Sequence, residues 1–379
     1  MSLKKLFPLF FLVLLLPLRS QAALSAPFEV SGWIPYWRNA TGTMEFLTHI
    51  DKFKEINPFG YTVKSDGTLF DASGLSQAPW PDLEKLAKAK QIRFVPTVMW
   101  SDGATIDKIL RNPKTRAAHI KNIVSVVKAN NFDGIDIDYE AKLAETQPYF
   151  SAFLKELYAA MGPKWVECDI EARTPADSRR DPTPDTPDQY ANDYKAIGKY
   201  CDRVRLMAYD QASVDQKLTL STSGPYVPVA DPKWVEKVVN LAAQSIPKSK
   251  ITLGVATYGY EYKVTPLTSG YDYQFLWAFN PKYATDLAAS LGLVPQRNVA
   301  GELSLTYRPS DATASISPSS ASAISAAGSA LNQSFNILWW SDASAIKDKV
   351  DLAKRLGLRG ISIFKIDGGA DPNLWSVLP

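Results

Sequence analysis

The stretch 132–140, FDGIDIDYE, constrains the fold of this 379-residue chain more than any other. Asp136, Asp138 and Glu140 alternate in it with apolar residues, which predicts a strand whose acids share one face. Helical patterns at 123–127 and 149–154 flank it, and a strand between helices favours a parallel sheet with both faces covered. Acidic side chains on a covered sheet face are costly to bury, so their presence indicates a chemical function. Two plainer interpretations stay open, an edge strand with a hydrated acidic face and a carboxylate metal site.

The acids of this strand are close enough to affect one another's ionisation. Side chains two residues apart on a strand have their bases about 6.5–7 Å apart. Like charges at this separation disfavour one another, so at least one of the carboxyl groups is expected to have a raised pKa. A carboxylic acid that stays protonated near neutral pH is what general acid catalysis requires.

Strand and helix patterns alternate along the rest of the chain. Besides the acidic strand, strands are predicted at 28–36, 55–63, 92–99, 165–172, 204–209, 251–257 and 360–366. Helices are predicted at 44–53, 82–90, 115–130, 147–161, 189–200, 232–244 and 343–356. This order predicts an α/β fold, a closed (β/α)8 TIM barrel with its active site at the carboxyl ends of the strands. The alternative, an open doubly wound sheet, lacks a glycine-rich phosphate turn after the first strand.

The segment between the seventh and eighth predicted strands is too long for a simple loop. It begins with a Tyr- and Trp-rich run, contains a strand-like stretch at 302–307 and includes a Ser/Ala-rich stretch at 312–329. We predict a small inserted α+β subdomain at 260–338 with a mobile lobe.

The N-terminus carries the features of a secretory signal peptide. A charged start, an apolar run and small residues near a cleavage point predict a leader at 1–22 and a mature barrel at 23–379. The alternative, an uncleaved anchor, is disfavoured because the apolar run is shorter than the roughly 20 residues of a spanning helix. We therefore expect a secreted or periplasmic protein with no stable membrane anchor after cleavage.

Charge and composition limit the partners that we expect. The chain has 42 Lys and Arg against 39 Asp and Glu, and three of the basic residues lie in the leader, so the mature protein is close to neutral. That balance gives no reason to expect a nucleic-acid partner. Only two histidines are present, which leaves little for a Ser-His-Asp triad or a His-rich metal site. The protein is expected to be a monomer.

Cys168 and Cys201 are the only cysteines. Cys168 falls inside one predicted strand and Cys201 just ahead of the next. We expect two buried thiols, with a disulfide as the alternative in an exported chain.

The spacing Asp133-x-x-Asp136-x-Asp138-x-Glu140 resembles the signature of glycoside hydrolase family 18, the chitinase family. Further stretches are similar to other strands of that family, and the resemblance covers nearly the whole mature chain. These stretches are 32–37, 57–61, 207–210 (Met-Ala-Tyr-Asp) and 254–260. The bacterial branch of cell-wall and spore-cortex hydrolases is the closest by resemblance. An insertion forming one wall of the groove is also what the family implies.

The resemblance implies a role for each matching residue and neither a cofactor nor a metal. Glu140 is the expected general acid, and the substrate's own 2-acetamido oxygen attacks the sugar in place of a second carboxylate. Asp138 is expected to orient the acetamide N–H, and Asp136 to share a proton or hydrogen bond with it. Tyr209 is expected to donate to the acetamide carbonyl, and Asp210 to hydrogen-bond the same sugar or its neighbour.

Aromatic residues near strand ends are candidate platforms for the apolar face of a sugar ring. The substrate-binding candidates are Trp33, Tyr36, Trp37, Tyr61, Trp100, Trp339 and Phe364. Phe364 departs from the family, in which many members end the eighth strand with a tryptophan. Because phenylalanine stacks over less area, weaker sugar binding is expected there.

Three further side chains have predicted places. Arg205 shares strand parity with Tyr209, so we expect it inside the barrel, paired with Asp169 or Glu167. Asp133, of opposite parity to the other acids, is expected to hydrogen-bond backbone at the strand's start. Arg173 is interpreted as a surface arginine, the alternative being contact with an acidic substituent such as the lactyl group of muramic acid.

Two functional hypotheses follow from the sequence. The first is a secreted retaining hydrolase of β-1,4-linked N-acetylglucosamine polymers, chitin or peptidoglycan. The second is a chitinase-like lectin that binds such glycans without cutting them. Lectins of this kind usually lack the terminal acid, and this chain has Glu140, so the enzyme is favoured.

Overall fold

The computed structural model describes residues 27–179, 185–186, 189–309 and 333–379. The predicted leader at 1–22 and the Ser/Ala-rich stretch at 312–329 lie outside these described residues.

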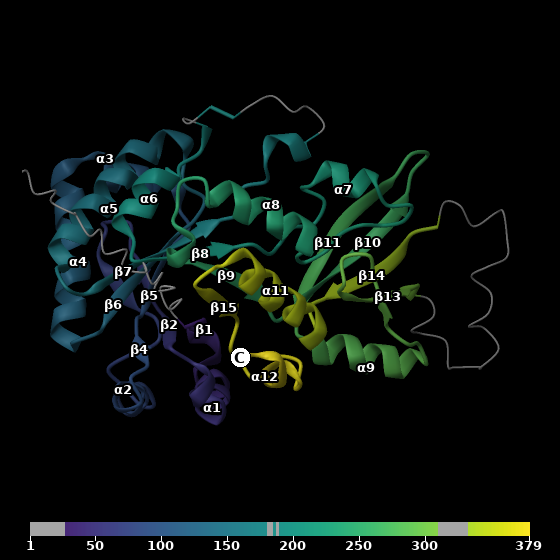
Figure 1. Ribbon diagram of the computed structural model, residues 1–379, viewed down its shortest axis with the longest axis horizontal. Coiled ribbons are helices and arrows are strands. Elements are labelled where there is room, and N and C mark those ends of the chain that lie inside the picture. The colour runs from purple at the N-terminus through teal and green to yellow at the C-terminus, as the bar shows by residue number, and fades with distance from the viewer. Residues whose placement is uncertain (1–26, 180–184, 187–188, 310–332) are drawn as a thin grey trace, which may run out of the picture.

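A closed barrel of eight parallel strand positions forms the centre of the fold, as the sequence predicts (Figure 1). The ring closes because β1 pairs on one side with the second strand and on the other with the last. In chain order the barrel strands are β1 (Glu29–Pro35), β2 (Glu55–Val63), β4 (Arg93–Phe94) with β5 (Thr97–Trp100), β6 (Gly134–Tyr139), β7 (Trp165–Glu171), β8 (Arg203–Met207), β9 (Ile251–Ala256) and β15 (Gly360–Phe364). A short β3 (Leu69–Asp71) adds antiparallel to β2.

The third barrel strand is not continuous, although the sequence pattern predicts one strand at 92–99. The structure divides it into β4 and β5 on either side of Val95 and Pro96. Pro96 has no backbone N–H to give to the ladder, so the pairing is interrupted there. The Pro96 carbonyl still accepts a hydrogen bond from the Asp136 backbone at 3.0 Å, which keeps the strand aligned with β6.

Helices cover the outside of the barrel. They are α1 (Asn39–Thr48), α2 (Trp80–Ala89), α3 (Gly103–Arg111), α4 (Pro113–Asn130), α5 (Gln147–Met161), α6 (Tyr194–Tyr200), α7 (Gln216–Leu220), α8 (Pro232–Ala242), α11 (Ala343–Leu356) and α12 (Leu374–Val377). The sequence analysis missed α3, α7 and α12, placed the first helix at 44–53 instead of 39–48, and began α6 too early. Asp193 starts α6, because its side chain accepts a hydrogen bond from the Lys195 backbone. None of the helices in the described part of the chain has the length and apolarity needed to cross a bilayer.

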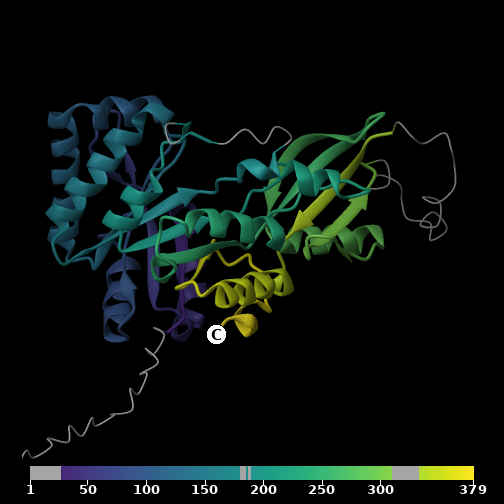
Figure 2. The same cartoon turned by 45° about the horizontal axis from the view of Figure 1, so that its top comes forward.

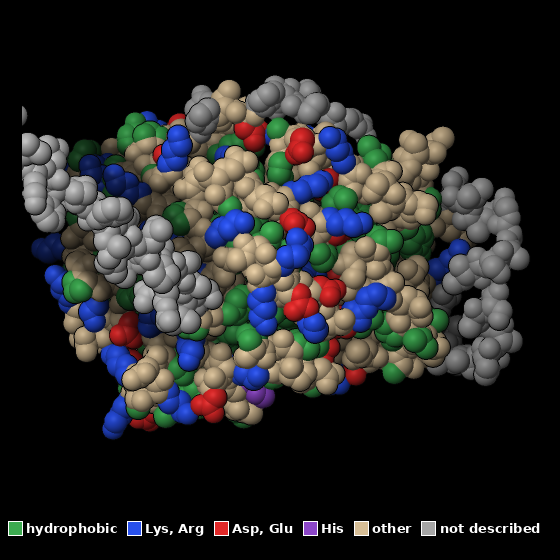
Figure 3. Space-filling model, in the orientation of Figure 1, with side chains coloured by type: hydrophobic (Ala, Val, Ile, Leu, Met, Phe, Trp, Pro, Cys, Tyr) green, Lys and Arg blue, Asp and Glu red, His purple; other side chains and the backbone are tan. Residues whose placement is uncertain are grey.

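An antiparallel sheet lies between β9 and β15 in the chain, where the sequence predicts an α+β insertion. Its strand order is β11-β10-β14-β13-β12. The elements are β10 (Gly259–Pro266), β11 (Tyr271–Phe279), α9 (Pro281–Leu291), β12 (Gln296–Arg297), β13 (Leu303–Tyr307) and β14 (Phe335–Trp340). Figures 1 and 2 place this sheet on the opposite side of the molecule from α4 and α5. Basic and acidic side chains are interspersed over the face shown in Figure 3.

The expectation of two free thiols is wrong, because Cys168 and Cys201 form a disulfide. Cys168 alternates along β7 with the inward-facing Glu167 and Asp169, so its side chain points toward the helix layer. Cys201 ends α6, which packs in that layer, and the two Cα atoms are 6.0 Å apart. The disulfide joins the end of α6 to β7 within the buried core.

Charged side chains fill part of the barrel interior. The Arg205 guanidinium forms ion pairs with Glu55, Glu167 and, at 2.6 Å, Asp136, and lies 3.7 Å from Asp169. The five side chains are almost completely shielded from solvent. This confirms the prediction that Arg205 points inward to meet β7 carboxyl groups, and adds partners from β2 and β6.

Candidate active site

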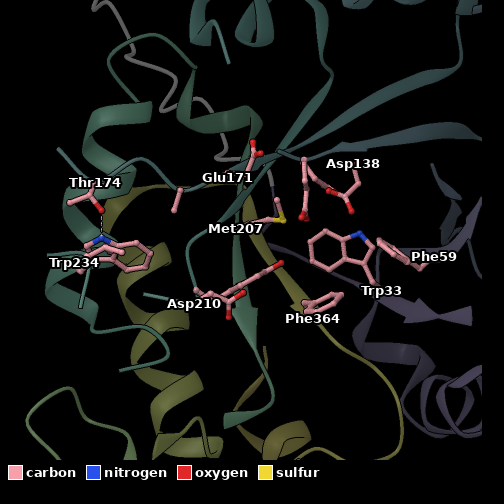
Figure 4. Close-up of a pocket in the computed structure, with 14 residues that line it drawn as sticks. Trp33, Phe59, Asp138, Glu171, Thr174, Met207, Asp210, Trp234 and Phe364 are labelled. Atoms are coloured by element: carbon pink, nitrogen blue, oxygen red, sulfur yellow. Dashed lines mark hydrogen bonds between the residues drawn. The ribbon is translucent and has the colours of Figure 1, made fainter. Parts of the chain in front are cut away.

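A cavity of about 460 Å³ opens at the carboxyl ends of the barrel strands. Most of its polar side chains lie close to or just beyond the end of a strand, because that is where parallel strands release the chain into loops. Glu140 follows β6, Glu171 ends β7, and Tyr209 and Asp210 follow β8. In Figure 4 Asp138, Trp33, Phe364 and Asp210 surround the same space.

The three acids in and directly after β6 lie on one side of the chain at successive depths, as the alternating pattern predicts. Asp136 is fully buried and accepts hydrogen bonds from Trp33 Nε1 at 3.1 Å, Thr97 Oγ1 at 2.7 Å and Arg205 at 2.6 Å. Asp138 is buried above it and borders the cavity. Glu140 is half-buried at the cavity wall. This stretch therefore brings two carboxyl groups, Asp138 and Glu140, to the cavity and supports them from below with Asp136.

Burial and neighbouring charge favour the protonated forms of the upper two acids. Burial raises the pKa of Glu140, the negative charge of Glu171 raises it further, and a hydrogen bond with Asp138 only partly offsets this. Burial raises the pKa of Asp138 well above its ordinary value, and the charges of Glu140 and Asp136 add to the effect. These carboxyl groups form a coupled set in which protons persist to higher pH than in water.

Tyr209, Phe364 and Trp33 form an aromatic corner of the cavity. The rings of Tyr209 and Phe364 stack with centroids 5.8 Å apart and an interplanar angle of 15°. Trp33 meets Phe364 edge to face at 5.8 Å. The side chain of Tyr209 is thereby held by packing in the cavity that also contains Glu140 and Asp138.

Asp210 is fixed at the cavity mouth by two tyrosine hydroxyls from the start of the inserted sheet. Tyr258 donates to its carboxylate at 2.6 Å and Tyr260 at 2.5 Å. Its φ of +59° lies in the left-handed region, which turns the chain sharply after Tyr209. Burial raises the pKa of Asp210, although both hydroxyls act in the opposite direction. The insertion thus positions a side chain of the barrel.

Five predicted aromatic platforms are not among the residues that line this cavity. Trp100 packs against His119 and Tyr139 in the helix layer. Tyr61 is buried in the core, and Trp339 lies in a separate core of the inserted sheet against Tyr226. Tyr36 packs on the edge of Trp37, beside the cavity residue Phe59. Trp37 is also absent from the cavity walls, so of the seven candidates the structure brings together Trp33 and Phe364.

The cavity also contains residues that the sequence analysis did not select. Phe59 and Met207 border it, and Trp234 closes one side, where its Nε1 donates to Thr174 Oγ1 at 2.9 Å (Figure 4). The sequence analysis did not select Glu171 either. Its position as the last residue of β7 was the signal, since strand ends line the active-site face of such barrels.

Glu171 is held by three donors. The Ala141 backbone donates to it at 3.0 Å, Asn192 at 2.7 Å and Lys142 at 3.3 Å. Its carboxylate is therefore a fixed negative charge beside Glu140. Within the described ranges, no group of three or more His, Cys, Asp or Glu side chains is arranged to hold a metal ion.

Comparison with known proteins agrees with this arrangement. The family model for glycosyl hydrolases family 18 matches residues 32–369. The glycosylase YvbX of Bacillus subtilis (strain 168) is 25% identical over 211 residues, which are 53% of this chain and 58% of that protein. The cortical fragment-lytic enzyme of the same organism is 27% identical over 282 residues, 72% of this chain and 55% of that protein. The chain thus spans little more than half the length of these curated relatives.

Solved structures share the fold. The spore cortex-lytic enzyme SleL of Bacillus megaterium QM B1551 has a TM-score of 0.67 at 23% identity, covering 93% of this chain and 73% of that chain. A chitinase from Chromobacterium violaceum ATCC 12472 has a TM-score of 0.69 at 20% identity, covering 93% of this chain and 98% of that chain. Because the family model spans nearly all of the described barrel, the chain belongs to family 18 of the glycosyl hydrolases.

Proposed function

We propose that this protein is a secreted retaining hydrolase of β-1,4-linked glycans that contain N-acetylglucosamine, either chitin or peptidoglycan. One observation carries the proposal. The carboxyl group of Glu140, whose pKa is raised by burial, shares a cavity with Asp138 and the hydroxyl-bearing Tyr209. Relatives named as cortical fragment-lytic enzymes and chitinases support both glycan classes.

In the proposed mechanism Glu140 gives its proton to the glycosidic oxygen as the bond to the leaving sugar breaks. The acetamide carbonyl oxygen of the sugar attacks the anomeric carbon and forms a cyclic oxazolinium ion. Asp138 accepts the acetamide N–H, and Tyr209 holds the carbonyl oxygen in line. Ionised Glu140 then takes a proton from the incoming water. The water oxygen attacks the anomeric carbon from the face that the leaving group occupied and opens the oxazolinium ring, so the anomeric configuration is retained.

The raised pKa of Asp138 supports a mechanism in which the acetamide oxygen of the substrate, and not a second carboxylate, attacks the sugar. Burial and the charges of Glu140 and Asp136 raise this pKa well above the ordinary value. A protonated carboxylic acid is a poor nucleophile, whereas it is a suitable partner for an amide. The two-carboxylate scheme needs an ionised second group, which this position disfavours.

The acetamide group of the substrate gives a direct test. The wild-type protein is expected to cleave chito-oligosaccharides with retention, measured by NMR of the newly formed reducing ends. Oligosaccharides lacking the acetyl group on the reacting sugar are expected to react at least about 10²-fold more slowly, because the positioned nucleophile is missing. Inversion, or equal rates on both substrates, would contradict the mechanism. Binding of both glycan classes without any cleavage would instead identify a lectin.

A change at Glu171 tests how the proton on Glu140 is held. In Glu171→Gln the like charge beside Glu140 is removed, so the pKa of Glu140 is expected to fall. A general acid works only while protonated, so the alkaline limb of the kcat/KM profile should move to lower pH. Glu145→Gln, an exposed acid nearby, is the control and should leave the profile in place. An alkaline limb that stays fixed or moves to higher pH in Glu171→Gln would rule out this electrostatic coupling.

A further inference from the structure

A second, smaller cavity of about 210 Å³ adjoins the active-site cavity. Glu171 and Ala172 border both, so the two spaces meet at the end of β7. We call the smaller one the side pocket, and its remaining charged or aromatic walls come from Lys142, Arg173, Tyr190 and Tyr194.

The side pocket carries an excess of positive charge. Lys142 is paired with Glu171 at 3.3 Å, and its side chain is almost fully buried. Arg173, two residues beyond Glu171, has no carboxylate partner among the residues that the structure describes. Lys142 and Glu171 cancel, so Arg173 leaves a net charge of one positive unit facing this space.

Arg173 is held in place by rings. Its guanidinium lies 4.4 Å from the ring centroid of Tyr190 and 4.8 Å from that of Tyr194. Two ring contacts restrict the movement of the guanidinium, which lowers the entropy cost of binding a ligand through it. The Arg173 Nε is buried without a hydrogen-bond acceptor in the described structure.

A second donor in the pocket also lacks a partner. Tyr194 is 7% exposed, and its hydroxyl makes no hydrogen bond within the described residues. A buried hydroxyl without a partner costs free energy, so a ligand that accepts from it would gain that energy on binding. A planar anion can accept from both the guanidinium and this hydroxyl, whereas a neutral sugar hydroxyl would leave the charge of Arg173 uncompensated.

We infer that the side pocket binds a carboxylate carried by a substituent of the glycan, next to the sugar that reacts at Glu140. This inference rests on the proposed function and specifies its substrate, an acidic glycan in preference to a neutral one. The shared wall at Glu171 sets the position, since Glu171 lies beside both Glu140 and Lys142. The carboxylate can come from a lactyl ether on the sugar itself or from a peptide attached to it.

The test compares glycans that differ in this carboxylate. The acidic substrate is a tetrasaccharide of alternating N-acetylglucosamine and N-acetylmuramic acid with free lactyl groups, and the neutral one is the N-acetylglucosamine tetramer. In Arg173→Gln the ratio of kcat/KM on the acidic to the neutral glycan is expected to fall about 10-fold or more, as expected for a lost charge-assisted hydrogen bond. Tyr194→Phe, which keeps the ring, should lower the ratio less. The exposed Arg355→Gln is the control and should leave it unchanged.

Two further substrates identify the source of the carboxylate. When the lactyl carboxyl is reduced to an alcohol, wild type and Arg173→Gln should show the same ratio. A glycan whose lactyl groups carry peptides tests the peptide as the source. A dependence on Arg173 with either acidic glycan supports the inference. A ratio that Arg173→Gln leaves unchanged with both, or equal losses on acidic and neutral glycans, overturns it.

Binding separates this inference from the proposed function. The same glycans are titrated by calorimetry into Glu140→Gln, with and without Arg173→Gln. If the wild type cleaves nothing, the proposed hydrolase fails, yet an Arg173-dependent preference for the acidic glycan in Kd would still support the side pocket. If the wild type cleaves both glycans and Kd shows no such preference, only the side pocket fails.

Discussion

Glu140→Gln is expected to lower the kcat for glycan cleavage by about 10²- to 10⁴-fold, the usual contribution of a positioned general acid. Glutamine keeps the size of the side chain and can still donate a hydrogen bond, but it has no proton to transfer. Burial and the charge of Glu171 raise the pKa of this carboxyl group and so favour its protonated form, and the substitution removes the transferable proton without placing a charge in the cavity.

Glycan affinity gives the check on this prediction. Since Trp33, Tyr209 and Phe364 still form the aromatic corner, the Kd of Glu140→Gln for chito-oligosaccharides should stay near the wild-type value. Rates are measured by release of reducing ends and Kd by calorimetry, with Glu145→Gln as the matched control. A Glu140→Gln protein that retains most of its kcat would mean that another group delivers the proton, and the assignment of Glu140 would be wrong.

Alternation along the strands was the most reliable signal in the sequence. It placed the acids of β6 at the site and predicted that Asp133, of opposite parity, would bond to backbone. The structure confirms this, because the Asp133 carboxylate accepts from the Phe94 backbone at 2.8 Å. It also predicted the inward Arg205, which lies four residues before Tyr209 and therefore shares its strand parity. These predictions succeed because side-chain direction follows from the backbone of a strand alone.

Most predictions of aromatic sugar platforms were wrong, and for Trp100 and Tyr61 the reason is the direction in which the strand points the side chain. Register pairs Trp100 with Tyr139, which faces the helices, so the same parity rule applied to β5 would have excluded it. Tyr61 follows a register shift between Phe59 and Tyr61, which directs Phe59 to the cavity and Tyr61 to the core. A bulge of this kind depends on neighbouring strands, although Gly60, a glycine inside the strand pattern, is a local sign of it. The disulfide was missed for a similar reason, because it depends on where the end of α6 packs against β7, which the local sequence does not determine.

Arg205→Met is expected to destabilise the fold by about 3–5 kcal/mol, the usual cost of removing one partner from a buried ion pair. Burial raises the pKa of Glu167 and Asp169 well above their ordinary values, which favours their neutral forms. For Glu55 burial acts in the same direction, but Arg205 and Arg93 outweigh it and lower the pKa, so Glu55 is ionised. Without Arg205, the carboxylate of Glu55 and the buried side chain of Asp136 have lost their shared positive partner, and solvent does not reach them to compensate.

A second substitution shows whether lost charge compensation is the cause. In Arg205→Met/Glu55→Gln one of the carboxylates that depended on Arg205 is neutral, so part of the lost stability should return in urea unfolding followed by circular dichroism. Arg355→Met, which breaks the exposed pair with Glu236, is the control and should leave the unfolding midpoint nearly unchanged. If the double variant is no more stable than Arg205→Met, the loss reflects packing around the methionine instead. Recovery would instead mean that the carboxyl groups below Asp138 and Glu140 depend on one buried arginine, and that the fold and the acidity of the site share this support.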